Sequence, residues 1–133
     1  MPLVFCYGTL AFPEIMTTVT GRHFPAVAAT LGGYARYCVK NAIYPAIVVE
    51  AGAQTEGTLY CDIDPVSLRR LDRYEDSIYV RRTVNVRTVD GAIRAAQTYI
   101  VPAQRRWILS ARPWDKMHFA RHHLKAYLAQ IGK

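Results

Sequence analysis

The hydrophobic positions in the first two thirds of the chain form short runs and alternating stretches, a pattern typical of strands. Leu3 to Tyr7 is an apolar run that ends at Gly8-Thr9, which predicts a buried strand followed by a tight turn. Further strands are predicted over residues 26–39, 46–50 and 57–63 and, as a hairpin around Asp90-Gly91, over residues 79–89 and 93–101.

Three other segments carry the signals of helices. Residues 13–20 begin with a proline and stop before a glycine, and residues 64–75 begin with an Asp-Pro pair that supplies both a cap and a first-turn proline. Residues 115–131 place apolar side chains at helical spacing and are followed by Gly132. Residues 102–113, which precede this closing helix, are predicted to form a loop.

The order of these elements indicates the fold class. Strands and helices do not alternate along the chain, so a doubly wound parallel sheet is disfavoured. Gly8, Gly32, Gly33 and Gly57 stand at the ends or in the interiors of predicted strands, where glycine permits a bend, a bulge or a close approach of two backbones. We therefore predict a single α+β domain over residues 1–133, with a small and strongly curved or barrel-like sheet.

Composition excludes several classes of protein. The chain has 133 residues, of which 51% are hydrophobic and 20% charged, so it has enough apolar surface to fold without disulfides. Its three cysteines show no CxxC spacing, no basic leader precedes the first apolar run, and no apolar run approaches the roughly 20 residues that cross a bilayer. We expect a soluble cytoplasmic protein without membrane partners.

The net charge of +7 raises the question of a nucleic-acid partner. The basic residues are distributed over several predicted elements instead of forming one stripe, so a solvated basic surface that attracts acidic small molecules is the favoured interpretation, and no nucleic acid is expected. A basic nucleic-acid-binding domain stays as an alternative.

The helix over residues 64–75 carries the most informative candidate. Glu75 lies seven residues after Leu68 and four after Leu71, on the apolar stripe of that helix. A carboxylate directed toward an apolar interior has its pKa raised by desolvation, which suits a general acid and base near neutral pH. The alternative is a carboxylate that reaches water or pairs with an arginine such as Arg81. Asp72 shares part of the stripe and is expected to accept structural hydrogen bonds.

Other features allow both a functional and a structural interpretation. The turn at residues 7–10 brings backbone N–H groups together in a nest that can hold an anion, although such turns after buried strands are often only structural. His118 and His122 are four residues apart on one helical face, but no third ligand is apparent, so no metal is predicted. The segment of residues 104–116 carries two tryptophans and either forms a lid or packs the last helix onto the sheet.

Several motifs, in this order along the chain, resemble one known family. They are Tyr7-Gly8-Thr9-Leu10, Tyr44-Pro45-Ala46, the stretch from Thr55 to Tyr60, Leu71-Asp72-Arg73-Tyr74-Glu75, and Tyr79-Val80-Arg81-Arg82. Together they resemble the γ-glutamylcyclotransferase-like family, which includes γ-glutamylamine cyclotransferases and avirulence-induced-gene-like proteins. The resemblance covers roughly residues 3–101, and the combination is more specific than any single motif.

The resemblance implies a small curved mixed β-barrel with flanking helices and a cofactor-independent enzyme. In such an enzyme the α-amino nitrogen of a γ-glutamyl group attacks its own γ-carbonyl, which releases an amine and leaves 5-oxoproline. By resemblance, Glu75 is the catalytic acid and base, and the backbone N–H groups of Tyr7, Gly8, Thr9 and Leu10 hold the carboxylate end of the substrate. Tyr44 and Tyr79 complete the predicted set of substrate-binding residues, and the only partner expected is a small γ-glutamyl molecule.

One departure from the family pattern concerns the residue after the predicted catalytic glutamate. The family often has a glycine there, whereas this chain has Asp76, a second carboxylate that would raise the pKa of Glu75 further if it lies close. Because many members of the family have no demonstrated activity, a non-catalytic module that binds an anionic small molecule in the same cavity is a second hypothesis.

Overall fold

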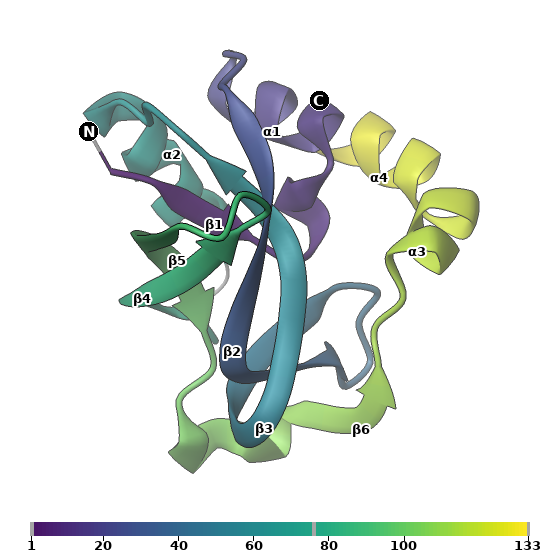
Figure 1. Ribbon diagram of the computed structural model, residues 1–133. Coiled ribbons are helices and arrows are strands. Elements are labelled where there is room, and N and C mark those ends of the chain that lie inside the picture. Colours follow the sequence, from purple (N-terminus) through teal and green to yellow (C-terminus); the bar gives the residue numbers. More distant parts are fainter. Residues whose placement is uncertain (1, 76, 133) are drawn as a thin grey trace.

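The strands of the protein close into a small mixed barrel (Figure 1) in a computed structural model that describes residues 2–75 and 77–132. They are β1 (Val4–Cys6), β2 (Ala26–Val39), β3 (Pro45–Tyr60), β4 (Val80–Thr88), β5 (Ile93–Ile100) and β6 (Leu109–Pro113). Hydrogen-bonded neighbours follow the order β3-β1-β5-β4-β2, and β2 pairs again with β3 to close the ring. The β1–β5 pair is parallel and the others are antiparallel, while β6 pairs with β2. The predicted α+β barrel is confirmed.

Helices cover one end of this barrel. The α-helices are α1 (Pro13–Thr20), α2 (Pro65–Tyr74), α3 (Lys116–His122) and α4 (Leu124–Ile131), and the 3-10 helices are η1 (Thr9–Ala11) and η2 (Ala103–Ile108). In Figure 1, α1, α2 and α4 gather at one end, and the hairpin of β2 and β3 extends away from them. Within residues 2–75 and 77–132, no helix is long and apolar enough to cross a membrane.

Strand β1 lies between two hydrophobic cores. Phe5 and Tyr7 pack inside the barrel with residues such as Ile47, whereas Val4 and Cys6 pack against the helices. All of these side chains are at most 6% exposed. Alternate residues of a strand face opposite sides, so β1 packs against both cores. This packing also fixes the position of the turn that follows β1.

The two strands predicted over residues 46–50 and 57–63 are not separate, so that prediction was wrong: residues 46–50 and 57–60 belong to the single strand β3, and residues 61–63 lie beyond its end. β3 runs without interruption beside β2, and the register between the two strands shifts between Gly32 and Tyr34. Gly33 and Gly52 both have φ of +82°, a left-handed conformation that glycine adopts without steric cost. The glycines therefore bend the strand pair at a bulge without ending either strand.

The predicted loop over residues 102–113 is also wrong, because it contains η2 and β6. Residues at the two ends of β6 pair with Tyr37 and Val39 of β2. Trp114 is buried, its ring centroid lies 5.7 Å from that of Phe119, and its Nε1 donates a hydrogen bond to Ile43 O at 2.9 Å. Trp107 is 69% exposed. Trp114 therefore packs the last helices onto the barrel, as the second of the two interpretations proposed.

The closing helix predicted over residues 115–131 is broken into α3 and α4 at His123, whose φ of −130° and ψ of −26° are not helical. The break lets residues of both helices reach one core: Phe119 of α3 is buried, and its ring centroid lies 5.7 Å from that of Tyr127 of α4. Asp115 caps α3 by accepting hydrogen bonds from the N–H groups of its first turn, and Gly132 ends α4 as predicted.

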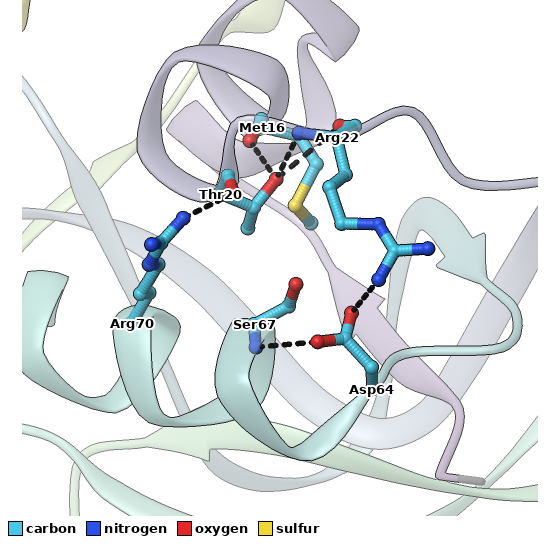
Figure 2. Close-up of polar contacts among 6 residues, drawn as sticks. All are labelled: Met16, Thr20, Arg22, Asp64, Ser67 and Arg70. Atoms are coloured by element: carbon cyan, nitrogen blue, oxygen red, sulfur yellow. Dashed lines mark hydrogen bonds and ion pairs between the residues drawn. The ribbon is translucent and has the colours of Figure 1, made fainter.

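Polar contacts tie the end of α1 to the start of α2 (Figure 2). Arg70 donates a hydrogen bond to Thr20 O at 2.7 Å, and the buried Thr20 hydroxyl donates to Met16 O at 2.7 Å. Asp64 caps α2 by accepting from Ser67 N at 3.1 Å and forms an ion pair with Arg22 at 3.1 Å. These contacts set the direction of α2 and therefore the position of Glu75 at its C-terminal end.

Replacing the cap of α2 is expected to weaken the fold moderately. Asp64→Ala leaves the N–H group of Ser67 without its acceptor and should lower the melting temperature by about 4 °C in differential scanning calorimetry. Asp64→Asn keeps an oxygen at the cap and loses only the charge that faces Arg22, so a smaller decrease is expected. Equal decreases in the two variants would show that the ion pair, not the cap, holds α2.

Candidate active site

A cavity of about 160 Å³ opens where the turn after β1 meets the last turn of α2. It is lined by Phe5, Cys6, Tyr7, Gly8, Thr9, Leu10, Tyr44, Pro45, Tyr74, Glu75, Tyr79, Tyr99 and Tyr127. All seven residues that the sequence analysis assigned to catalysis or substrate binding lie in this lining, although they come from four separate segments of the chain. The roles assigned to them stay predictions.

Glu75 reaches the cavity from the end of α2. It is the cap residue of the helix, with φ of −70° and ψ of 138°, and its N–H group donates to Leu71 O at 3.0 Å. Leu71 is fully buried one turn earlier, so the apolar side of α2 fixes the position of the half-buried Glu75. Asp76, the second carboxylate considered in the sequence analysis, lies outside the described residues.

Asp72 has the structural role that was predicted for it. Its Oδ1 accepts a hydrogen bond from the Tyr99 hydroxyl at 2.7 Å and forms an ion pair with Arg81 Nε at 3.0 Å. Arg81, which was considered as a partner of Glu75, forms this ion pair with Asp72. By holding the Tyr99 hydroxyl, Asp72 orients an aromatic ring that forms part of the cavity wall.

The turn at Tyr7 to Leu10 depends on close packing around Gly8. A Cβ atom at Gly8 would lie 2.8 Å from Pro45 Cγ, so no larger residue fits without displacing the start of β3. Gly8 also precedes η1, which has no hydrogen bond from a capping side chain. The first N–H groups of a helix have no acceptor within the helix, so this turn presents N–H donors beside the cavity.

Three tyrosines of the cavity wall were not singled out in the sequence. They are Tyr74, Tyr99 and Tyr127. The Tyr74 hydroxyl makes hydrogen bonds with Thr9 Oγ1, at 2.9 Å, and with the Tyr127 hydroxyl. Tyr74 could have been noticed as the neighbour of Glu75, but no local signal marks Tyr99 in β5 or Tyr127 in α4.

Four titratable groups of the cavity, the thiol of Cys6 and the hydroxyls of Tyr7, Tyr79 and Tyr99, are kept in their neutral forms. Burial raises the pKa of Cys6 and of Tyr7 well above the ordinary values, and the negative charge of Glu75 raises both further. The pKa of Tyr79 is raised mainly by burial, and that of Tyr99 by burial and by the hydrogen bond to Asp72. The Tyr7 hydroxyl donates to Tyr99 O at 2.6 Å, and that of Tyr79 donates to Pro45 O at 2.6 Å.

These raised pKa values predict a loss of stability in alkaline solution. The folded protein holds its phenolic and thiol protons more tightly than the unfolded chain does, so the resulting stability is complete below about pH 9 and decreases as the pH rises. We expect the free energy of unfolding, measured by urea titration, to decline steadily from pH 9 to pH 11. Tyr7→Phe has one such phenol fewer and should show a shallower decline; the same slope as in the wild type would contradict the assignment.

The described residues form no cluster of side chains that could bind a metal. Among residues 2–75 and 77–132, no group of three or more His, Cys, Asp and Glu side chains is close enough to hold a metal ion. His118 and His122 lie on an exposed face, with ring centroids 4.5 Å apart. The three cysteines are free thiols.

This chain is similar to a described protein family and to several solved structures. A family model described as "Gamma-glutamyl cyclotransferase, AIG2-like" matches residues 4–116. AIG2-like protein A of Arabidopsis thaliana is 29% identical over 98% of this chain and 79% of its own length. A solution structure of an Arabidopsis thaliana protein superposes with a TM-score of 0.75 at 24% identity, covering 97% of this chain and 78% of that one.

A solved structure titled "Gamma-glutamyl cyclotransferase" also has the same fold. It superposes with a TM-score of 0.65 at 16% identity and covers 97% of this chain and 85% of its own. The family model ends at residue 116, so the match does not include α4, which contributes Tyr127 to the cavity.

Proposed function

This chain belongs to the gamma-glutamyl cyclotransferase, AIG2-like family, and we propose that it is an enzyme which converts a γ-glutamyl amine, or another γ-glutamylated small molecule, to 5-oxoproline and a free amine. The observation that carries the proposal is the position of Glu75. Among the described residues that line the cavity, Glu75 is the only Asp, Glu, Lys, Arg or His. One carboxylate in a pocket otherwise built from tyrosine rings, apolar side chains and a glycine-containing turn suits a reaction that needs one acid and base.

Proton transfer is the proposed role of Glu75. The carboxylate accepts a proton from the α-ammonium group of the substrate, which frees the nitrogen lone pair to attack the γ-carbonyl carbon. A C–N bond forms in the new ring and the original amide C–N bond breaks. Glu75 passes two protons in turn from the attacking nitrogen to the departing nitrogen, so the ring keeps one N–H and the amine leaves as an ammonium ion. One residue thus serves as base and then as acid, and these steps require no cofactor.

The tyrosines form the walls of the proposed site and do not transfer protons. Burial and the hydrogen bonds described above keep the hydroxyls of Tyr7, Tyr79 and Tyr99 protonated. Their rings, together with Tyr44, hold the substrate in one conformation with the amine close to the γ-carbonyl. Because the attack is intramolecular, a fixed conformation removes much of its entropic barrier.

The turn at Tyr7 to Leu10 is the proposed anchor of the α-carboxylate. The cavity lining includes no Lys or Arg among the described residues, so a carboxylate in it requires N–H or hydroxyl donors. Gly8, Thr9 and Leu10 lie in the lining and supply backbone N–H groups, which also can stabilise the oxyanion that forms during the attack.

Mass spectrometry of the reaction products tests the proposal. The purified protein is incubated with γ-glutamyl alkylamines, γ-glutamyl dipeptides and glutathione, and 5-oxoproline is measured with each. We expect 5-oxoproline from at least one compound, at a rate proportional to protein concentration. A higher melting temperature with these compounds but no 5-oxoproline would instead support the non-catalytic binding module. The absence of both a product and a thermal shift would contradict both functions.

A further inference from the structure

The backbone turn of the proposed site is supported from behind by an arginine that the motifs do not include. Arg36 of β2 directs its guanidinium to two backbone oxygens: Nη1 donates to Tyr7 O at 2.7 Å and to Glu56 O at 3.0 Å. The first of these oxygens belongs to the peptide bond between Tyr7 and Gly8. Arg36 does not line the cavity, so it contacts this peptide from outside the proposed site.

The guanidinium is held firmly in this position. Its Cζ atom lies 5.5 Å from the centre of the Trp114 ring, and Trp114 is only 6% exposed and anchored by its own hydrogen bond to Ile43 O. A cation over the face of a tryptophan is attracted to the ring. An arginine side chain stays protonated in proteins, so a full positive charge lies against the Tyr7 carbonyl.

The geometry of a peptide bond connects this charge to the cavity. In a trans peptide the C=O and N–H groups point in opposite directions, so an arginine on Tyr7 O lies on the side opposite to Gly8 N–H. A second hollow, of about 510 Å³, is lined by Arg36 as well as Arg87, and Tyr7 lines both this hollow and the cavity. Gly8 lines the cavity but not this hollow, which places the oxygen of the Tyr7–Gly8 peptide toward Arg36 and its N–H on the side of the cavity.

We propose that Arg36 is a positioning residue, which fixes the Tyr7–Gly8 peptide and polarises it so that Gly8 N–H binds the substrate carboxylate more strongly. A charge-assisted hydrogen bond to a carbonyl oxygen withdraws electron density from the amide, and hydrogen bonds in such a chain strengthen one another. Arg36 thus supplies positive charge to a cavity that has no cationic side chain in its described lining. This inference rests on the proposed function of the cavity.

Matched variants separate this role from a general effect on folding. Arg36→Met removes the charge and both hydrogen bonds, Arg36→Lys keeps the charge, and Arg87→Met removes one charge from the same hollow. Arg87, in β4, donates a hydrogen bond to Gly91 O and not to the turn, so it serves as the control. Each variant is assayed with a γ-glutamyl amine and with the same compound carrying an α-carboxamide in place of the α-carboxylate.

We expect Arg36→Met to raise KM for the carboxylate substrate by about tenfold, with a much smaller change in kcat and little change for the carboxamide. Arg36→Lys should recover part of the loss, and Arg87→Met should resemble the wild type. Equal losses for the two substrates would mean that Arg36 only supports the fold, and unchanged KM in Arg36→Met would also overturn the proposal.

An NMR measurement tests Arg36 independently of catalysis. The Gly8 amide proton is expected to move upfield in Arg36→Met but not in Arg87→Met, and the Kd of 5-oxoproline to increase about tenfold in Arg36→Met alone. If the wild type turns over no substrate, the proposed reaction fails, and these two readouts still decide the role of Arg36. An unchanged Gly8 shift with an unchanged Kd, or no 5-oxoproline binding to the wild type, would overturn it.

Discussion

Glu75→Gln is expected to decrease the turnover number for 5-oxoproline formation at least about 1000-fold, because the amide can neither accept the ammonium proton nor return one to the departing amine. General acid–base catalysis contributes roughly 10²- to 10⁴-fold to a rate, and here one residue performs both transfers. The side chain keeps its size and lies in a cavity, not in the packed core, so the melting temperature should change little. Turnover is measured by mass spectrometry and folding by circular dichroism.

Glu14→Gln provides the control for this substitution. Glu14 lies exposed in the first turn of α1 and undergoes the same chemical change outside the cavity lining, so wild-type turnover is expected. Substrate binding should survive in Glu75→Gln, because the proposed anchor of the carboxylate is the backbone of the turn. Product formation at the wild-type rate by Glu75→Gln would exclude Glu75 as the acid and base and leave the fold assignment intact.

Gly57→Ala is expected to cause the largest loss of stability, about 3 kcal/mol or more. Gly57 lies in β3, where that strand passes β1, and a Cβ atom there would be 2.5 Å from Cys6 O and 2.8 Å from Phe5 Cζ. The oxygen belongs to the backbone of a strand fastened by two cores, so it cannot move without opening the barrel. Urea unfolding followed by tryptophan fluorescence measures the effect.

Gly32→Ala is the matched control for the barrel. Gly32 also lies in a long strand, but a Cβ atom there would meet nothing within 4 Å, and its φ is not positive. The free energy of unfolding should therefore change by less than about 1 kcal/mol. Similar losses in Gly57→Ala and Gly32→Ala would mean that backbone flexibility, not the close approach of β3 to β1, explains the presence of glycine at both positions.

Local sequence signals were sufficient for elements whose ends are marked by particular residues. As predicted, α1 begins at Pro13 and ends before Gly21. Asp64 caps α2, and the turn at Asp90-Gly91 joins β4 to β5. In each case the first or last residue makes the hydrogen bond, or adopts the backbone angle, that ends the element. Such signals act over a few residues and do not depend on the rest of the fold.

Predictions failed where contacts between distant segments override a local pattern. β3 continues through residues 51–56, which were expected to separate two strands, because its pairing with β2 supplies hydrogen bonds on both sides of the bulge. β6 exists because β2 is long enough to pair with it, and α3 and α4 separate at His123 so that both reach one core. β2 and β6 lie far apart in the sequence, so no local pattern predicts that pairing.

The candidate site shows the same division. The residues proposed for its centre could be named before the fold was known, because the apolar stripe of one helix and the family resemblance point to Glu75, and the end of one strand and the same resemblance point to the turn at Tyr7 to Leu10. Their surroundings depend on the folded chain: Tyr99 and Tyr127 reach the cavity from β5 and α4, and Arg36 reaches the turn from β2. The closure of the barrel brings these distant segments together, and a pattern of neighbouring residues carries no information about that closure.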